Sequence, residues 1–255
     1  LGAFAAPFCT TSQSFATPSS MLICLVGAVD GTVLSLNATW NKTSELPYFN
    51  EKSVLQKDTF GQADSSKSEA RPFCADFDDD GDLDCLVGDK YGYVSYAENT
   101  GSSWDVSEEY FNGERFAGGN TAVVRTAPFC FDVDNDGDYD CLVGTNGGKT
   151  QLVRNIGSAS SPVWDVDYSG DYFGSDAVTS SPAFFAAAPF CGDFDGDSVA
   201  ECLVGDLSGR VNFFVRTDLT SSPGNFAWSS YSESQATSLS DGVKYTTSLR
   251  VDHCE

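Results

Sequence analysis

A four-fold internal repeat constrains the fold of this chain more than any other feature of its sequence. The triplet Pro-Phe-Cys occurs four times, and each copy is followed by a second cysteine within the phrase Cys-Leu-Val-Gly. The opening cysteines lie 56 to 65 residues apart. Self-similarity at such a period is typical of a protein built by repeating one supersecondary unit. The four cysteine pairs are Cys9 and Cys24, Cys74 and Cys85, Cys130 and Cys141, and Cys191 and Cys202.

Each repeat has the sequence pattern of β-structure. The Cys-Leu-Val-Gly segments are short apolar runs typical of strands buried on both faces. A glycine turn follows at Gly31, Gly92, Gly148 and Gly209, and then comes a run rich in β-branched and aromatic residues. A further short strand is expected at 47–49, 104–106, 163–166 and 226–228. No segment shows the apolar periodicity of an amphipathic helix.

About four short strands in each repeat predict an all-β, β-propeller-like fold with four antiparallel blades. A β-solenoid, or an array of the same sheets that does not close, is the alternative. We expect a single domain over 1–255, divided into repeats at 1–65, 66–121, 122–182 and 183–255, with a C-terminal strand in the last.

Three of the repeats carry an acidic loop between their paired cysteines. The loops read DFDDDGDLD (76–84), DVDNDGDYD (132–140) and DFDGDSVAE (193–201), with carboxylates at positions 1, 3, 5 and 9. Ca²⁺ takes six to eight oxygens from a loop that curls around it, including backbone carbonyls. Carboxylates crowded this closely repel one another and need a counter-charge. The sequence therefore predicts three calcium sites rather than solvated acidic turns. It predicts none in the first repeat, where 10–23 contains no carboxylate.

The phrase PFCxDxDxDGDxDCLVG, followed by NTG (99–101) or NIG (155–157), resembles the FG-GAP or VCBS-type repeat of integrin-α-like β-propellers. The resemblance covers nearly the whole chain as four units. The family commonly builds seven blades, however, and does not generally bracket its loops with cysteines. The resemblance implies backbone carbonyl ligands from Asp82, Asp138 and Val199. It implies side-chain ligands from Asp76, Asp78, Asp80, Asp84, Asp132, Asp134, Asp136, Asp140, Asp193, Asp195, Asp197 and Glu201.

The paired cysteines predict four disulfides and an oxidising compartment. A soft-metal site is disfavoured, because His253 is the one histidine and there is no CxxC motif. Cys254 is left over, in register with the opening cysteine of a fifth repeat. The chain could belong to a longer propeller, Cys254 could close a ring through Cys9, or it could reach a neighbouring subunit. Sequons at Asn37 and Asn41 predict N-glycosylation.

Charge and missing motifs exclude several function classes. A net charge of −23 argues against binding to nucleic acid or to anionic lipid, and the longest apolar run, 21–29, is too short to span a bilayer. Of the 37 acidic residues, 15 lie in the three loops, and no nucleophile elbow, zinc motif or P-loop is present. We therefore expect a non-enzymatic, secreted or cell-surface, calcium-binding structural or adhesive protein.

The expected partners are extracellular. Head-to-tail self-assembly is the first possibility, and binding to other extracellular proteins or glycans is the second. The alternative function is a calcium-dependent lectin that reads sugars with Tyr91, Tyr93 or Trp164.

Overall fold

A computed structural model describes residues 5–11, 22–40, 47–55, 69–101, 103–107, 110–111, 115–116, 124–166, 171–173, 187–196, 199–205, 211–216 and 228–231. Within these residues the chain forms sixteen strands and no α-helix, which confirms the all-β prediction. The strands make four antiparallel sheets of four strands each. The described part contains no helix with the length and hydropathy needed to cross a membrane.

Each sheet is a meander built from one repeat, with its strands paired in chain order. Sheet one contains β1 (Ala5–Thr11), β2 (Leu22–Ala28), β3 (Val33–Trp40) and β4 (Pro47–Leu55). Sheet two contains β5 (Arg71–Ala75), β6 (Asp84–Gly88), β7 (Val94–Asn99) and β8 (Trp104–Ser107). Sheet three contains β9 (Ala127–Phe131), β10 (Asp140–Gly144), β11 (Thr150–Asn155) and β12 (Trp164–Val166). Sheet four contains β13 (Ala188–Gly192), β14 (Glu201–Gly205), β15 (Val211–Arg216) and β16 (Trp228–Tyr231).

The second strand of each sheet is the one that carries Cys-Leu-Val-Gly. Every residue of β6 and of β10 is buried, as a strand covered on both faces requires, and β14 is buried at three of its five positions. The turn that follows has positive φ at Gly31, Gly92 and Gly148, as the sequence predicts, while Gly209 lies outside the described residues.

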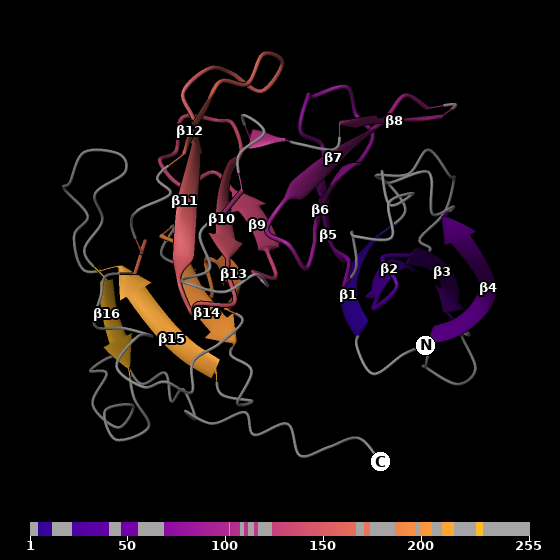
Figure 1. The fold of residues 1–255 in the computed structure, drawn as a ribbon, viewed down its shortest axis with the longest axis horizontal. Helices are drawn as coiled ribbons and strands as arrows, with labels where there is room; N and C mark the ends of the chain where they lie inside the picture. Colours follow the sequence, from indigo (N-terminus) through magenta and orange to yellow (C-terminus); the bar gives the residue numbers. More distant parts are fainter. Residues whose placement is uncertain are drawn as a thin grey trace.

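The sheets are arranged in a row through their first strands. β1 contacts β5, β5 contacts β9 and β9 contacts β13, and no comparable contact joins β13 to β1 among the described residues. In Figure 1 the four sheets follow one another along an arc, from sheet one at the right, over sheets two and three in the upper part, to sheet four at the lower left. The described structure is thus four consecutive packed sheets, with sheet one and sheet four at the ends of the row.

One contact recurs wherever two sheets meet, and we call it the sheet junction. The glycine of the Cys-Leu-Val-Gly phrase, at or next to the end of the second strand, lies against a backbone carbonyl just before the first strand of the next sheet. A Cβ atom at Gly27 would stand 1.9 Å from the Ala70 carbonyl oxygen, and one at Gly144 would stand 2.2 Å from that of Ala187. At Gly88 the corresponding distance, to the Thr126 carbonyl oxygen, is 2.3 Å. Only glycine permits this approach.

Backbone hydrogen bonds and prolines complete each sheet junction. The amides of Ala70, Thr126 and Ala187 donate to the carbonyls of Ala28, Asp89 and Thr145, at 3.1, 3.0 and 3.0 Å. The proline of the Pro-Phe-Cys triplet packs beside the same glycine, and Pro72, Pro128 and Pro189 are all buried. The three junctions are therefore built in the same way from equivalent residues.

A row of phenylalanines also links the four sheets. The rings of Phe8, Phe73, Phe129 and Phe190 contact one another in that order, with centroid separations of 5.3, 5.0 and 5.1 Å. Each is the phenylalanine of Pro-Phe-Cys, so the triplet supplies both the proline of one junction and the aromatic contact between sheets. Aromatic pairs at such separations stabilise packing beyond their buried area.

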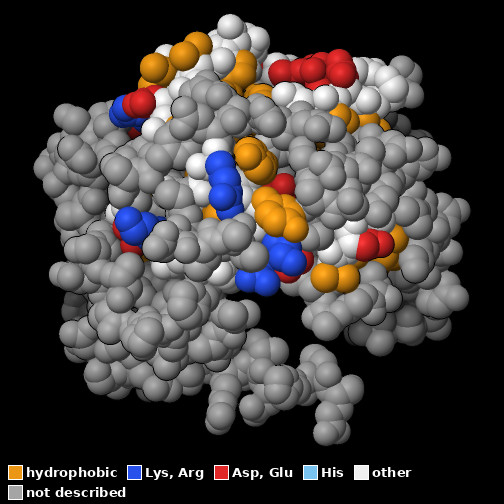
Figure 2. All heavy atoms as spheres, in the orientation of Figure 1, with side chains coloured by type: hydrophobic (Ala, Val, Ile, Leu, Met, Phe, Trp, Pro, Cys, Tyr) orange, Lys and Arg blue, Asp and Glu red, His pale blue; other side chains and the backbone are white. Residues whose placement is uncertain are grey.

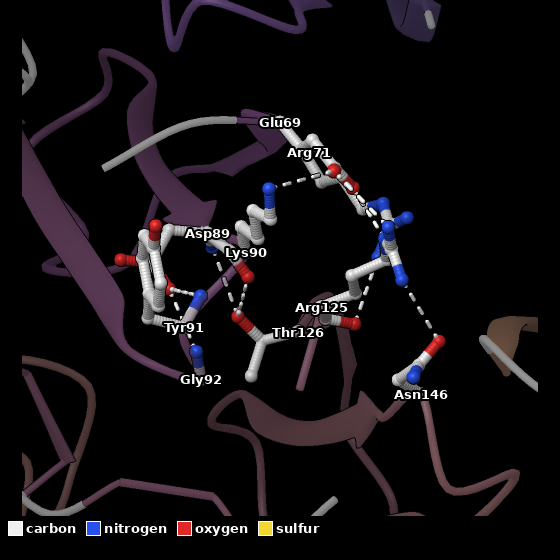
Figure 3. A network of polar contacts seen from close by, with 9 residues as sticks. All are labelled: Glu69, Arg71, Asp89, Lys90, Tyr91, Gly92, Arg125, Thr126 and Asn146. Carbon is white, nitrogen blue, oxygen red and sulfur yellow. Dashed lines mark hydrogen bonds and ion pairs between the residues drawn. The ribbon is translucent and has the colours of Figure 1, made fainter. Parts of the chain in front are cut away.

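Sheets two and three are further joined by a basic cluster, which consists of Arg71, Lys90 and Arg125 around Glu69 (Figure 3). The Arg125 guanidinium donates two hydrogen bonds to the Glu69 carboxylate and a third, at 3.3 Å, to Asn146 Oδ1. Arg71 donates to the Arg125 carbonyl at 2.7 Å. Burial lowers the pKa of Arg71 to about 10, against an opposing effect of Glu69 and with a smaller lowering by Arg125.

The acidic loop of sheet two lies away from the basic cluster. The acidic loop precedes β6, whereas Lys90 follows it, so the two kinds of charge lie at opposite ends of that strand. Figure 2 shows one group of acidic side chains at the upper edge of this face and basic side chains near its centre, where some acidic side chains lie beside them. The acidic loop of sheet two is therefore kept apart from Lys90 of the basic cluster.

Candidate metal centres

The acidic loops connect the first and second strands of sheets two, three and four. In each sheet the two cysteines stand opposite each other in the strand register and are disulfide-bonded, with Cα atoms 4.0 to 4.1 Å apart. Cys9 and Cys24 are bonded in the same way in sheet one. A disulfide across so short a loop contributes about 3 kcal/mol by limiting the unfolded chain. The ends of each acidic loop are therefore held together covalently.

The carboxylate of the first aspartate in each loop accepts hydrogen bonds from backbone amides later in the loop, so the loop curls around this side chain. Asp76 accepts hydrogen bonds from the amides of Asp80 and Gly81, both at 3.1 Å. Asp132 accepts the equivalent pair from Asp136 and Gly137, at 3.1 and 3.0 Å. In the third loop the Gly196 amide donates to Asp193 at 2.6 Å. These bonds use the short side chain of aspartate, which reaches backbone amides three to five residues ahead.

Two positions of the loop have left-handed backbone conformations. Position 6 has φ of 94° at Gly81 and 98° at Gly137, a region that residues with a Cβ atom rarely adopt. Position 4 has φ of 63° at Asp79 and 61° at Asn135, residue types that tolerate it, and the third loop has Gly196 there with φ of 86°. The third loop therefore keeps a glycine at the turn although Ser198 stands at position 6.

These bends bring carboxylates together in three clusters. In each, one oxygen from every member lies within 4.8 Å of the others, which is close enough for all to contact one cation. The clusters are Asp76, Asp78 and Asp80, then Asp132, Asp134 and Asp136, and finally Asp193, Asp195 and Glu201. Nine of the twelve predicted side-chain ligands are thus brought together, while Asp197 lies outside the described residues.

The predicted fourth ligands of the first two loops, Asp84 and Asp140, do not join these clusters. Both are buried at the start of their strands, where they accept hydrogen bonds. Asp84 accepts from the Asn99 amide at 2.8 Å and from the Tyr96 hydroxyl at 2.9 Å. Asp140 accepts from the Asn155 amide at 2.8 Å and from the Val133 amide at 3.1 Å. Their role as metal ligands stays a prediction.

These hydrogen bonds give the asparagine of the NTG and NIG motifs a structural role. The side chain of Asn99 accepts from the Gly101 amide, and that of Asn155 accepts from the amides of Gly157 and Val163. The side chain of each asparagine therefore stabilises its own turn. Its backbone amide orients the carboxylate at position 9 of the loop. The sequence marks these asparagines as part of a motif, but their contacts with Asp84 and Asp140 follow only from strand pairing.

Several loop carboxylates have one oxygen without a hydrogen-bond partner and are held close to like charges. One oxygen each of Asp82, Asp134 and Asp138 is buried without a hydrogen-bond partner among the described atoms. Burial, followed by repulsion from Asp136, Asp134 and Asp132, raises the pKa of Asp138 to about 6. Buried acceptors without a donor, in a region of concentrated negative charge, fit a bound cation.

We expect opposite pH responses for the calcium-free and calcium-loaded protein. Burial is the main reason why the pKa of Asp84 is raised to about 6 and that of Asp140 to about 7. The ordinary pKa of an aspartate is 3.8. Between about pH 7 and pH 4 the folded calcium-free chain therefore binds protons that the unfolded chain does not, so its free energy of unfolding rises as the pH falls. Calcium binding needs ionised carboxylates, so the stabilisation that calcium provides falls over the same interval.

Thermal melts at about pH 7.5 and pH 5, with chelator and with calcium, check this prediction. The melting temperature should rise on acidification in chelator, and the increment produced by calcium should shrink. An increment that is the same at both pH values would contradict it.

The remaining predicted residues have the following positions. Asn37 lies on β3, where its backbone is in register with Ile23 of β2 and Glu51 of β4. Asn41, His253, Cys254 and most of 10–23 lie outside the described residues. Of the aromatic residues considered for sugar binding, Trp164 packs against Phe111 and Tyr110, at 4.9 and 5.7 Å between ring centroids. Tyr91 and Tyr93 are half-buried, and Lys90 lies 6.0 Å from the Tyr91 ring centroid.

The features described so far define an all-β repeat protein with four disulfides and three carboxylate clusters that could each hold a cation. None of the protein-family models compared with the chain matches it, and the comparison with curated proteins likewise returned no match. The four disulfides suggest an oxidising, extracellular environment.

Proposed function

We propose that the protein is a non-enzymatic extracellular building block whose sheets are stabilised by Ca²⁺ and by disulfides. The observation that carries the proposal is the recurrence of one carboxylate cluster in three loops, each at the same place in its sheet. The bends, the first-aspartate hydrogen bonds and the bracketing disulfide recur with it. A solvated acidic turn has no need of this repeated geometry.

The donor set favours calcium among common cations. All nine clustered side chains are carboxylates, and hard oxygen donors suit Ca²⁺ better than they suit zinc or copper. Asp84 and Asp140 could still contribute, because a carboxylate oxygen that accepts one hydrogen bond retains a second lone pair. When bound, the ion would supply the counter-charge that the loop aspartates lack. It would also link the two strands that each loop connects.

The FG-GAP-like β-propeller remains our proposal for the fold family. It is supported by the four-stranded antiparallel meanders and by the position of the acidic loops between the first and second strands. The lectin alternative has less support, because Trp164 is partly buried against the core cluster of sheets two and three. A glycan-array screen in calcium would detect it.

Calcium stoichiometry tests the proposed function. Isothermal titration of the chelator-treated protein should give three equivalents of calcium, and Asp78→Asn should reduce the number to two by removing a ligand from the first cluster. Asp105→Asn is the matched control, because Asp105 is an exposed aspartate on β8 outside the clusters. An unchanged stoichiometry in Asp78→Asn, or no binding by the wild type, would reject calcium binding at these loops.

A further inference from the structure

Sheet one and sheet four each carry one side of a sheet junction that is not completed among the described residues. Sheet one has the Pro-Phe-Cys side, and sheet four has the glycine side. At the first end, Pro7 is exposed, whereas its equivalents Pro72, Pro128 and Pro189 are buried against the glycine of the preceding sheet. Phe8 has one neighbour in the phenylalanine row, Phe73, on the side of sheet two. Sheet one therefore presents a Pro-Phe-Cys strand with no preceding sheet packed on it in the described structure.

At the other end, sheet four exposes aromatic rings whose equivalents in sheet two are buried. Phe190 and Phe194 are 54% and 39% exposed, whereas the equivalent Phe73 and Phe77 of sheet two are 8% and 7% exposed. Phe77 owes its burial partly to sheet three, since its ring lies 5.5 Å from that of Tyr139. Phe190 and Phe194 stack on each other with centroids 5.9 Å apart and form an apolar patch. Exposed patches of this kind mark interaction sites.

The equivalent glycine of sheet four is Gly205, and no following sheet packs against it among the described residues. A Cβ atom at Gly205 would meet, among the described atoms, only the Ala188 carbonyl oxygen at 3.9 Å, which belongs to the paired strand of its own sheet. In the other three sheets the carbonyl of the next repeat lies at 1.9 to 2.3 Å from the same position. In the described structure, the space beside Gly205 is therefore not occupied by the backbone of a following repeat, as it is at Gly27, Gly88 and Gly144.

We propose that sheet four of one molecule binds the β1 end of sheet one of a second copy, and that this contact reproduces the internal sheet junction. Pro7 of the second copy would lie beside Gly205, and Phe8 would continue the phenylalanine row beyond Phe190. Among the described residues, β1 of the same molecule makes no contact with β13 comparable with those that join β1 to β5, β5 to β9 and β9 to β13.

The contact is heterologous, since different surfaces of the two copies meet. Such contacts propagate into open filaments or close into rings of several copies. The inference adds a partner and its docking surface to the proposed building block. It rests on the repeat architecture and not on calcium, so the calcium titration described above can succeed or fail independently.

Gly205→Val and Phe190→Ser test the docking surface. In light scattering over a wide range of concentration, the wild type should self-associate, and Gly205→Val should weaken that association roughly ten- to hundredfold because its side chain occupies the space kept for a carbonyl. Its melting temperature as a monomer should be unchanged. Phe190→Ser should weaken association as well. Ile156→Ser is the matched control, because Ile156 is 59% exposed but lies away from both ends of the row.

Three outcomes would overturn the proposal. The first is a wild type that stays monomeric at all concentrations. The second is a Gly205→Val monomer that melts at a lower temperature, because Gly205 would then contact a segment of its own chain. The third is an Ile156→Ser variant that loses association as strongly as Phe190→Ser, because the association would then be non-specific apolar adhesion.

Discussion

Chelation of calcium is expected to lower the melting temperature of this protein by roughly 20 °C. A ligand present at a hundredfold excess over its Kd stabilises the native state by about 2.7 kcal/mol per site, so three sites contribute about 8 kcal/mol. This is comparable with the whole net stability of an ordinary domain, about 5–15 kcal/mol. For a chain of this size each kcal/mol corresponds to about 2–4 °C.

Calorimetry in chelator and in millimolar calcium measures this shift. Asp78→Asn is the control, because a variant with two intact clusters should lose about two thirds as much. Since each loop is also closed by a disulfide, the calcium-free protein should retain its far-ultraviolet β signal below the lowered melting temperature. Identical melting temperatures with and without calcium would show that the metal is not part of the folded structure.

Gly144→Val should destabilise the protein by at least about 3 kcal/mol, because the added Cβ would lie 2.2 Å from the Ala187 carbonyl oxygen. That oxygen is backbone, and the Ala187 amide is itself hydrogen-bonded to Thr145. Relief of the clash therefore requires sheets three and four to separate. The separation would also break the contact of Phe129 with Phe190 and expose the buried apolar surface between the sheets.

Chemical denaturation of Gly144→Val measures the loss, and Gly205→Val is its control. The two glycines occupy the same place in the Cys-Leu-Val-Gly phrase, but only Gly144 is covered by a following sheet in the described structure. The same substitution should therefore be costly at one position and tolerated at the other. Equal losses at both positions would mean that the cost comes from strand conformation and not from the sheet junction.

Much of the fold was predictable because its determinants are close in the sequence. The cysteines that bracket an acidic loop are 11 residues apart, and hairpin pairing places them opposite each other. The aspartates of each cluster span five residues in the first two loops, so local bends alone bring them together. Buried strands at Cys-Leu-Val-Gly and positive φ at Gly92 and Gly148 likewise follow from short patterns.

Other parts of the candidate site depended on strand pairing over longer distances. Asp84 carries the sequence signature of a ligand, yet it lies beside Asn99, 15 residues later, and accepts a hydrogen bond from its amide. The third cluster includes Glu201, whereas Asp84 and Asp140 at the same position stay outside theirs, and the longer side chain of glutamate provides the extra reach. The spacing of carboxylates in the three loops is the same, so it does not predict which residue at position 9 joins its cluster.

The sequence by itself determined the number of repeats, because one phrase recurs four times along the chain. It also determined the all-β class, the disulfide pairs and the register of the acidic loops, because these depend on residues that are close in the sequence. Only the tertiary structure decided how the sheets meet. Glu69 and Arg125, which pair with each other in the basic cluster, are 56 residues apart, and their charges give no indication of this pairing in an acidic chain. Likewise Phe73 and Phe190 stand in the same triplet, but one is buried and the other exposed. The difference arises because the ring is buried only where another sheet packs against it. The Pro-Phe-Cys triplet itself does not specify whether such a sheet is present.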